Sequence, residues 1–290
     1  MNSAGKLFLV PTPIGNLEDF SPHAAKVLAE VDCIAAEDTR VAADLLAALS
    51  LPFKELISYH EHNEQSRQEQ LISALLDGQN IALVSDAGMP AISDPGEILV
   101  KAARKAGLEV IALPGPNAAI TALSASGLST RYFYFEGFLP VKGPERKERL
   151  AFLQNFPHSM IIYEAPHRLA KTLKDLIQYL GAERLICLAR ELTKKYETYL
   201  LLSLNEALAE IKREKARGEY VLILEGQKEF LERIPAVKAE CEAAELNNLR
   251  EDISSLKAEG LSDRTCLQIL QKFYPLGKNK IYELLRDFAD

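Results

Sequence analysis

Short apolar runs alternate with helical patterns along the first part of the chain. Apolar runs of four residues, which are typical of buried strands, occur at 7–10, 33–36, 56–59, 81–84 and 110–113. Helical patterns follow Ser21, an expected N-cap with Pro22 at the first position, fill 41–49 and 66–76, and begin again near Asp94–Pro95. Alternating strands and helices are joined by right-handed crossovers, so residues 1–118 are predicted to form a parallel α/β domain.

The pattern changes after residue 118. Strand-like runs become denser, and they occur at 132–135, 160–163, 185–189, 198–202 and 220–224. Shorter crossovers predict a second, mixed α/β domain over residues 119–228. The charged segment 142–149, K-G-P-E-R-K-E-R, is predicted to be an exposed loop that leads into a helix.

The last part of the chain, 229–290, has a helical pattern throughout. Residues 227–259 are rich in Glu, Lys and Ala and predict a helical linker or a mobile connection. Two helices follow from Leu261, with Ser262 as the cap of the first, a break at Pro275–Gly277 and Asn279 as the cap of the second. This layout predicts a helix-turn-helix module.

Four strand-like runs end in loops rich in Gly, Pro and Asp, at 11–15, 85–90, 114–117 and 164–167. The carboxyl ends of parallel strands share one edge of a sheet, and ligands bind there. The loops therefore predict a preformed pocket, although Gly and Pro also end strands for structural reasons alone. The G-x-x-x-x-G-K-[ST] and G-x-G-x-x-G patterns are absent, which disfavours a nucleoside triphosphate or a dinucleotide.

Composition excludes several classes of protein. Hydrophobic residues make up 48% and charged residues 26%, as in globular proteins, and no apolar stretch approaches the roughly 20 residues of a membrane helix. The opening segment lacks a signal-peptide core, so a cytoplasmic protein is expected. Metal or redox chemistry is not expected, because the four cysteines are dispersed and are predicted to be small buried residues: Cys33, Cys187, Cys241 and Cys266. A net charge of −7 means that a nucleic acid would need local basic clusters.

Seven sequence blocks carry a family resemblance. They are V-P-T-P-I-G-N-L-E-D (10–19), A-E-D-T-R (36–40), V-S-D-A-G-M-P-A-I-S-D-P-G (84–96), L-P-G-P-N-A (113–118), Y-E-A-P-H-R (163–168), A-R-E-L-T-K (189–194) and G-E-Y-V-L-I-L-E-G (218–226). In this order they resemble the tetrapyrrole-methylase superfamily of S-adenosylmethionine-dependent methyltransferases. Within it they are similar to the bacterial branch that methylates a cytidine 2′-hydroxyl of small-subunit (16S) ribosomal RNA. Pro11, Pro13 and Asn16 depart from the V-G-x-G-P-G-D opening of the porphyrin and corrin branch.

The resemblance implies an α/β fold of two domains with S-adenosyl-L-methionine in the cleft between them, a small C-terminal helical module, and a homodimer. Carried over by position, the cofactor-binding residues would be Ile14, Asp86, Ala87, Gly88, Asn117, Ala118, Tyr163, Ala189, Gly218, Glu219 and Tyr220. For Ala189 and Tyr220, packing in the core is an equally good interpretation.

Methyl transfer to a ribose hydroxyl requires alignment of the reacting atoms and benefits from a general base. The candidates in the motif loops are Glu37, Asp38, Arg40, His60, Asp86, Glu164, His167 and Arg168. We favour His167 or Glu164, because both lie in the loop that faces the predicted cleft. The alternative is an ion pair of Glu164 with Arg168 that holds the loop. Arg40 is expected to bind RNA phosphate or to brace Asp38.

The resemblance implies small-subunit ribosomal RNA as the partner, near the decoding region and in the assembled particle. Basic residues expected to contact it are Arg40, Arg146, Lys147, Lys194 and Lys195, with Lys272, Lys278 and Lys280 beside the C-terminal turn. Each cluster also fits a solvated face, and the helical module also fits a protein-binding role. Two rival functions remain open at this point: C-methylation of a tetrapyrrole, and a binding protein with a degenerate cleft.

Overall fold

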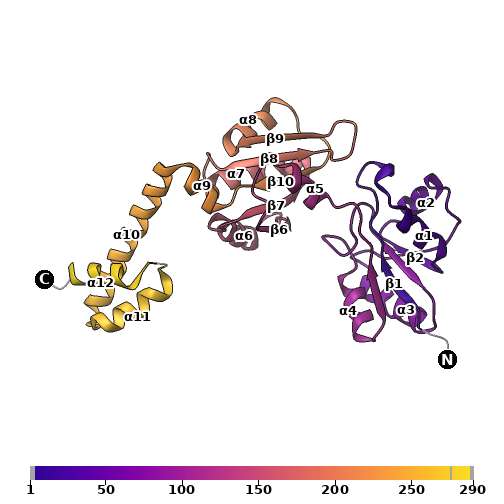
Figure 1. Ribbon diagram of the computed structural model, residues 1–290, viewed down its shortest axis with the longest axis horizontal. Coiled ribbons are helices and arrows are strands. Elements are labelled where there is room, and N and C mark those ends of the chain that lie inside the picture. The colour runs from indigo at the N-terminus through magenta and orange to yellow at the C-terminus, as the bar shows by residue number, and fades with distance from the viewer. Residues whose placement is uncertain (1–3, 275, 288–290) are drawn as a thin grey trace. The chain divides into compact units, whose positions relative to one another are not determined.

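The strands of the computed structural model, which describes residues 4–274 and 276–287, form two five-stranded sheets (Figure 1). The first sheet contains β1 (Lys6–Leu9), β2 (Cys33–Ala36), β3 (Glu55–Ser58), β4 (Ile81–Val84) and β5 (Glu109–Ala112). Their order is β3-β2-β4-β1-β5, and every neighbouring pair is parallel. The prediction of a largely parallel N-terminal sheet is therefore confirmed.

Helices cover both faces of the first sheet, as the apolar strands require. They are α1 (Pro22–Glu30), α2 (Thr39–Ala48), α3 (Glu64–Leu76) and α4 (Glu97–Lys105), with a short 3₁₀ helix, η1, at Leu17–Asp19. Leu28 and Leu46 of α1 and α2 pack on one face, and Leu71 and Leu99 of α3 and α4 pack on the other. The cap of α1 is Ser21, as predicted, since its hydroxyl accepts a hydrogen bond from the amide of Ala24 at 3.0 Å.

The second sheet is mixed, as predicted. It contains β6 (Phe133–Phe138), β7 (Ser159–Glu164), β8 (Leu185–Arg190), β9 (Thr198–Ser203) and β10 (Tyr220–Leu224), in the order β6-β7-β10-β8-β9. Only β6 and β7 of this sheet pair in parallel. Its helices are α5 (Ala118–Ala125), α6 (Pro144–Gln154), α7 (Pro166–Leu180) and α8 (Leu204–Arg213).

The two faces of the second sheet pack against different partners. Helices α6, α7 and α8 cover one face with side chains such as Leu150, Leu173 and Leu208. The other face packs against α5 and against Ile14 and Leu192, which come from two loops. Because Ile14 follows β1, this apolar cluster ties the loops of the first sheet to the second sheet.

The charged segment 142–149 differs from its prediction. Helix α6 begins at Pro144, directly after Gly143, so most of the segment is helical rather than a loop. Arg146 is buried and Arg149 is half-buried, because their guanidinium groups form ion pairs with Asp175 and Glu136. A run of charged residues does not show which of them form ion pairs with residues distant in the sequence.

The chain divides into two compact units, residues 1–227 and 228–290. The second unit consists of most of α9 (Gln227–Arg233) together with α10 (Pro235–Ala258), α11 (Asp263–Phe273) and α12 (Lys278–Asp287). Its core is formed by Leu249, Ile253, Cys266, Leu267, Leu270, Ile281 and Leu285. Helix α10 thus contributes to this core and is more than a linker.

Capping in the second unit agrees with the prediction at one position and not at the other. The Ser262 hydroxyl accepts a hydrogen bond from the amide of Thr265 and caps α11. The prediction that Asn279 caps the next helix is wrong, since α12 begins at Lys278 and the Gly277 carbonyl accepts its first hydrogen bonds. Pro275, part of the predicted break, lies outside the described residues.

Three of the four cysteines, Cys33, Cys187 and Cys266, are buried as predicted, and the side chain of Cys241 lies outside the described part. Burial raises the pKa of the Cys33 and Cys187 thiols to about 11, which keeps them protonated. Within the described residues, every helix is too short or too polar to cross a membrane.

Candidate active site

A cavity of about 340 Å³ lies where loops after β1, β4, β5 and β7 meet. We name it the Tyr163 cavity. It is lined by Ile14, Ala87, Gly88, Met89, Ile92, Ser93, Asp94, Asn117, Ala118, Phe138, Tyr163, Glu164, Ala165, Pro166, Leu192, Glu219, Tyr220 and Val221. Its volume is in the range of small-molecule sites, and its lining is mostly apolar with a few polar groups.

All four predicted loops contribute to this cavity. Of the predicted cofactor residues, eight are in the lining: Ile14, Ala87, Gly88, Asn117, Ala118, Tyr163, Glu219 and Tyr220. Parallel pairing places the first three loops at one edge of the sheet, and β7 and β10 bring in the others. The sequence therefore identified a set of residues that the fold does bring together.

The amino terminus of α5 forms one side of the cavity. The Asn117 side chain caps the helix by accepting a hydrogen bond from the amide of Ile120 at 3.0 Å. The Tyr163 hydroxyl accepts another from the amide of Ala119 at 3.2 Å, which fixes the tyrosine ring against the helix. Phe135 and Phe138 contact the same ring, with centroids 5.1 and 5.6 Å away. A helix amino terminus favours negatively charged groups of a ligand.

Two apolar lining residues are each flanked by residues with left-handed backbone. Ile92 lies between Ala91 (φ 66°) and Ser93 (φ 62°), and Leu192 lies between Glu191 (φ 52°) and Thr193 (φ 62°). This conformation costs free energy for a residue other than glycine, and such strained residues are found most often at functional sites. In both segments, the strained backbone accompanies an apolar side chain that lines the cavity.

Two glycines allow the backbones around the cavity to approach closely. A Cβ atom on Gly15 would lie 2.5 Å from Lys194 Cγ and 2.8 Å from Thr193 Oγ1. A Cβ atom on Gly137, whose φ is +71°, would lie 3.1 Å from Ser93 Oγ. Loops of the first sheet therefore lie close to the second sheet at two points beside the cavity. A side chain at position 15 would collide with the turn at 193–194, and one at position 137 would require a small shift of Ser93.

Asp94 is a lining carboxylate that sequence reasoning missed. Burial, followed by the nearby charge of Glu37, raises its pKa to about 6, and Asp86 adds to the effect. The pKa values of Glu37 and Asp86 are also raised, with burial as the largest cause. These acids follow β2 and β4, and no group of three that could hold a metal ion is found among the described residues.

Three predicted cofactor residues lie elsewhere. Asp86 turns away from the Tyr163 cavity, because its Oδ1 atom accepts a hydrogen bond from the amide of Asp38 at 3.0 Å. Ala189 is fully buried in the core, which is the alternative that the sequence left open. Gly218 packs against the side chain of Glu191, which lies where a Cβ atom would be. Tyr220 both packs in the core and lines the cavity.

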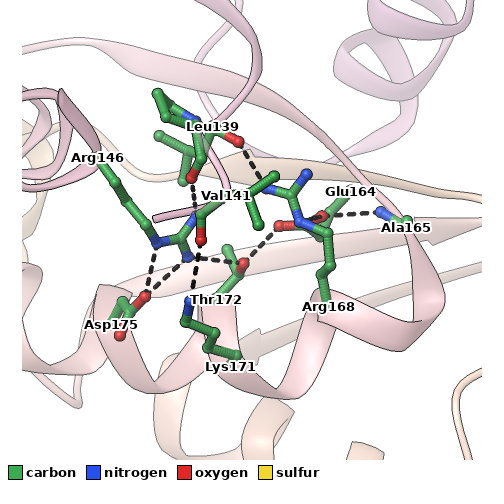
Figure 2. Close-up of polar contacts among 10 residues, drawn as sticks. Leu139, Val141, Arg146, Glu164, Ala165, Arg168, Lys171, Thr172 and Asp175 are labelled. Atoms are coloured by element: carbon green, nitrogen blue, oxygen red, sulfur yellow. Dashed lines mark hydrogen bonds and ion pairs between the residues drawn. The ribbon is translucent and has the colours of Figure 1, made fainter. Parts of the chain in front are cut away.

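Figure 2 shows that the predicted base Glu164 belongs to a structural network. Its side chain is buried; Oε1 accepts a hydrogen bond from the Ala165 amide at 2.9 Å and pairs with Arg168 Nε at 3.2 Å. Its Oε2 accepts a hydrogen bond from the Thr172 hydroxyl. Arg168 donates in turn to the Leu139 carbonyl. The predicted alternative, a loop-holding ion pair, is therefore what the structure contains.

His167 and Arg168 do not line the Tyr163 cavity. His167 is exposed on the first turn of α7 and is not a lining residue. Arg168 is committed to Glu164 and to the backbone of the preceding loop. Both observations weigh against His167 and Arg168 as catalytic residues, and Glu164 lacks a free carboxylate oxygen.

The predicted RNA-contacting residues differ in their availability. Arg146 is a correction: it is 5% exposed and donates to Asp175 and Thr172 (Figure 2). It also donates to the Pro140 carbonyl, so its guanidinium is not available to a phosphate. Lys194 forms ion pairs with Glu191 and Glu219 at 3.2 and 3.1 Å. The exposed basic residues of the predicted set are Arg40, Lys147, Lys195, Lys272, Lys278 and Lys280.

Comparison with known proteins identifies the family. Residues 6–208 match the tetrapyrrole (corrin/porphyrin) methylases. The chain belongs to this family of methyltransferases. It is also 44% identical over 280 residues to ribosomal RNA small subunit methyltransferase I of Synechocystis sp., with 97% of each chain covered. The protein of that name from Escherichia coli O157:H7 is 50% identical over 237 residues, covering 81% of this chain and 82% of the relative.

Solved structures of the family share the fold. The methyltransferase CobJ superposes with a TM-score of 0.60 at 20% identity, covering 78% of this chain and 95% of CobJ. Uroporphyrin-III C-methyltransferase from Thermus thermophilus, solved with S-adenosyl homocysteine, gives a TM-score of 0.55 at 18% identity, covering 78% of this chain and all of that one. At these identities the similarity concerns the fold alone.

We predict that Glu164→Gln lowers the free energy of unfolding by about 2–4 kcal/mol, because the buried charge of Arg168 loses its partner. Urea denaturation measures the change. The exposed neighbour provides the control, and His167→Gln should stay within about 0.5 kcal/mol of the wild type. If the Glu164→Gln protein is as stable as the wild type but no longer transfers a methyl group, Glu164 is again a candidate for the general base.

Asp94→Asn is expected to stabilise the protein at neutral pH. Folding raises the pKa of Asp94 from its ordinary value of 3.8 to about 6, so the folded state favours the protonated form. That contribution is present at low pH and is lost as the pH rises through 6. An asparagine carries no charge, so the variant should gain about 1–2 kcal/mol at about pH 7.5 and nothing at about pH 3.

Denaturation curves at both pH values test this expectation, with the exposed Glu69→Gln as the control. A gain of equal size at both pH values would show that the charge of Asp94 is not responsible.

Proposed function

We propose that this protein transfers a methyl group from S-adenosyl-L-methionine to the 2′-hydroxyl of a cytidine in 16S ribosomal RNA, near the decoding centre. The observation that carries the proposal is the extent of the similarity. Relatives named ribosomal RNA small subunit methyltransferase I match along 97% of the chain, including the helical unit 228–290. The tetrapyrrole methyltransferases of solved structure cover 78% of it at 20% identity or less, and they support the fold only.

The residues of the Tyr163 cavity fit the proposed methyl donor. Apolar side chains such as Leu192 and Val221 suit an adenine ring and the carbon atoms beside the sulfonium. The amino terminus of α5 at Asn117 suits a carboxylate. When bound, the donor supplies a methyl group on a positively charged sulfur.

The chain itself would contribute alignment and removal of a proton. The close contacts at Gly15 and Gly137 limit the opening of the cavity, and exclusion of water with fixed reactants accounts for much of the rate in such reactions. The oxygen–carbon bond forms as the carbon–sulfur bond breaks, and the hydroxyl proton leaves to a base. Asp94 replaces Glu164 and His167 as the first candidate, because it lines the cavity with a pKa of about 6.

The second unit is the proposed contact to the ribosomal particle. Lys272, Lys278 and Lys280 are exposed around the connection of α11 and α12, and Phe273 beside them is 75% exposed. Lysines bind phosphates, and an exposed aromatic ring offers a surface on which unpaired bases stack. The homodimer implied by the family resemblance and the cytoplasmic location expected from the sequence stay predictions.

The proposal predicts methylation of small subunits purified from a strain that lacks the gene. With donor labelled in its methyl group, the label should appear in one 2′-O-methylcytidine of 16S RNA, and subunits from the wild-type strain should accept almost none. Mapping the labelled nucleoside decides the outcome. Label on a tetrapyrrole instead, or no heat on titration with S-adenosylmethionine, would contradict the proposal.

Replacing Lys272, Lys278 and Lys280 by glutamine should weaken methylation of small subunits by raising KM. It should also reduce the salt dependence of RNA binding. The slope of the logarithm of the binding constant against the logarithm of the salt concentration should become less steep by about one for each phosphate that is no longer neutralised. Deletion of 228–290 should have a larger effect. Affinity for the methyl donor, measured by calorimetry, should not change in either variant. Unchanged KM values would show that this unit does not hold the RNA.

A further inference from the structure

A second cavity, of about 350 Å³, lies beside the Tyr163 cavity. We name it the Asp38 pocket. It is lined by Thr12, Pro13, Gly15, Leu17, Ala36, Asp38, Val41, Ala42, Asp44, Leu45, Ala48, Val84, Ser85 and Asp86. These residues lie in α2 and at the carboxyl ends of β1, β2 and β4, so the pocket opens at the ligand-binding edge of the first sheet.

The wall between the two cavities contains a paired stretch of the loops after β1 and β4. The Thr12 amide donates to the Gly88 carbonyl at 2.9 Å, and the Gly88 amide donates to the Thr12 carbonyl at 3.0 Å. Along this wall, Ile14 and Gly88 line the Tyr163 cavity, whereas Pro13 and Asp86 line the Asp38 pocket. A molecule that fills the second pocket therefore lies next to the first.

The rim of the Asp38 pocket presents apolar side chains to solvent. Leu17 is 40% exposed and Val41 is 41% exposed, although both are large and apolar. Apolar side chains exposed at the rim of a hollow suit the apolar face of a ligand. An unstacked nucleobase has two apolar faces and binds between side chains of this kind.

The charged groups of the pocket are carboxylates, which accept hydrogen bonds, whereas the Thr12 and Ser85 hydroxyls donate to backbone carbonyls. Asp38 pairs with Arg40 through Nε and Nη2 at 3.1 and 2.6 Å, which lowers the pKa of Asp38 to about 2 and keeps it ionised. Asp86 Oδ1 accepts the Asp38 amide, and its Oδ2 accepts no hydrogen bond from a described residue. A carboxylate accepts from the exocyclic amine of cytosine and repels the carbonyl oxygen that uracil has in its place.

Charge also determines which part of a nucleotide fits. Asp38, Asp44 and Asp86 make the lining negative, so a phosphate group is excluded from the pocket. The side chain of Arg40 is 87% exposed next to it, and Asp38 fixes the direction of its guanidinium. This arrangement suits a base inside the pocket and a phosphate outside it, on Arg40.

We infer that the Asp38 pocket binds one unpaired, amino-bearing pyrimidine base of the RNA substrate, with the amine on Asp86 and a flanking phosphate on Arg40. The inference rests on the proposed function, because it supplies the acceptor for the methyl group. With the base in this pocket, the attached ribose lies at the shared wall, beside the Tyr163 cavity. The pocket thus selects cytidine over uridine.

Fluorine NMR on the full-length protein tests the inference directly. We expect 5-fluorocytidine to bind and 5-fluorouridine to bind at least about tenfold more weakly. Val41→Trp, which fills the pocket from an exposed position, should abolish binding of 5-fluorocytidine. Asp86→Asn keeps the acceptor for the Asp38 amide but puts an NH2 donor in place of Oδ2, and it should reverse the preference toward 5-fluorouridine. Leu76→Trp, at an exposed site on α3, is the control and should behave as the wild type.

Equal binding of both nucleosides by the wild type, or 5-fluorocytidine binding that Val41→Trp leaves intact, would overturn the inference. Calorimetric titration with S-adenosylmethionine on the same variants separates this failure from that of the proposed function. If the donor binds and nucleoside discrimination is missing, the pocket assignment alone is wrong. If the donor does not bind to any of these proteins, the proposed function fails.

Discussion

Parallel pairing of β1 with both β4 and β5 is the constraint on which the site depends. Parallel strands run in the same direction, so the loops that follow them emerge at one edge whatever their sequence. Proline and glycine in these loops then fix the backbone there. The Tyr163 cavity and the Asp38 pocket both lie at this edge because the strand order places β4 between β1 and β2.

The second sheet completes the site by contact. Gly15 approaches the turn at 191–194 so closely that no Cβ atom fits, and Ile14 enters the apolar cluster of the second sheet. The same short loop therefore braces one sheet against the other, lines the Tyr163 cavity and forms part of the wall of the Asp38 pocket. A side chain at position 15 would collide with the turn at 191–194. It would therefore disturb the contact between the sheets, the Tyr163 cavity and the wall of the Asp38 pocket.

The sequence was sufficient for the strands and for the four loops, because apolar runs and Gly/Pro-rich breaks report on the local backbone. The sequence did not predict the position of a side chain that binds a partner distant in the sequence. Arg146 appeared as an exposed charge but is bound to Asp175, 29 residues away. Asp86 lies behind the wall because it binds the amide of Asp38, 48 residues away. Ile92 and Leu192 line the cavity between residues with left-handed backbone, and because these neighbours are not glycines the sequence did not indicate that conformation.

The distribution of charge is compatible with an acidic protein that acts on RNA, as we propose. Carboxylates gather around the two cavities, at Glu37, Asp38, Asp86 and Asp94, while exposed lysines lie elsewhere. The proposed methyl donor is a sulfonium cation, and the proposed base carries an amine that donates hydrogen bonds, so an acidic site suits both and repels phosphate. The positive charge on sulfur disappears on transfer. Carboxylates near the sulfur therefore bind the donor more tightly than the product, and this difference favours the exchange of product for donor. The same carboxylates stabilise the donor more than the transition state, in which the charge on sulfur is smaller, and this slows the transfer itself.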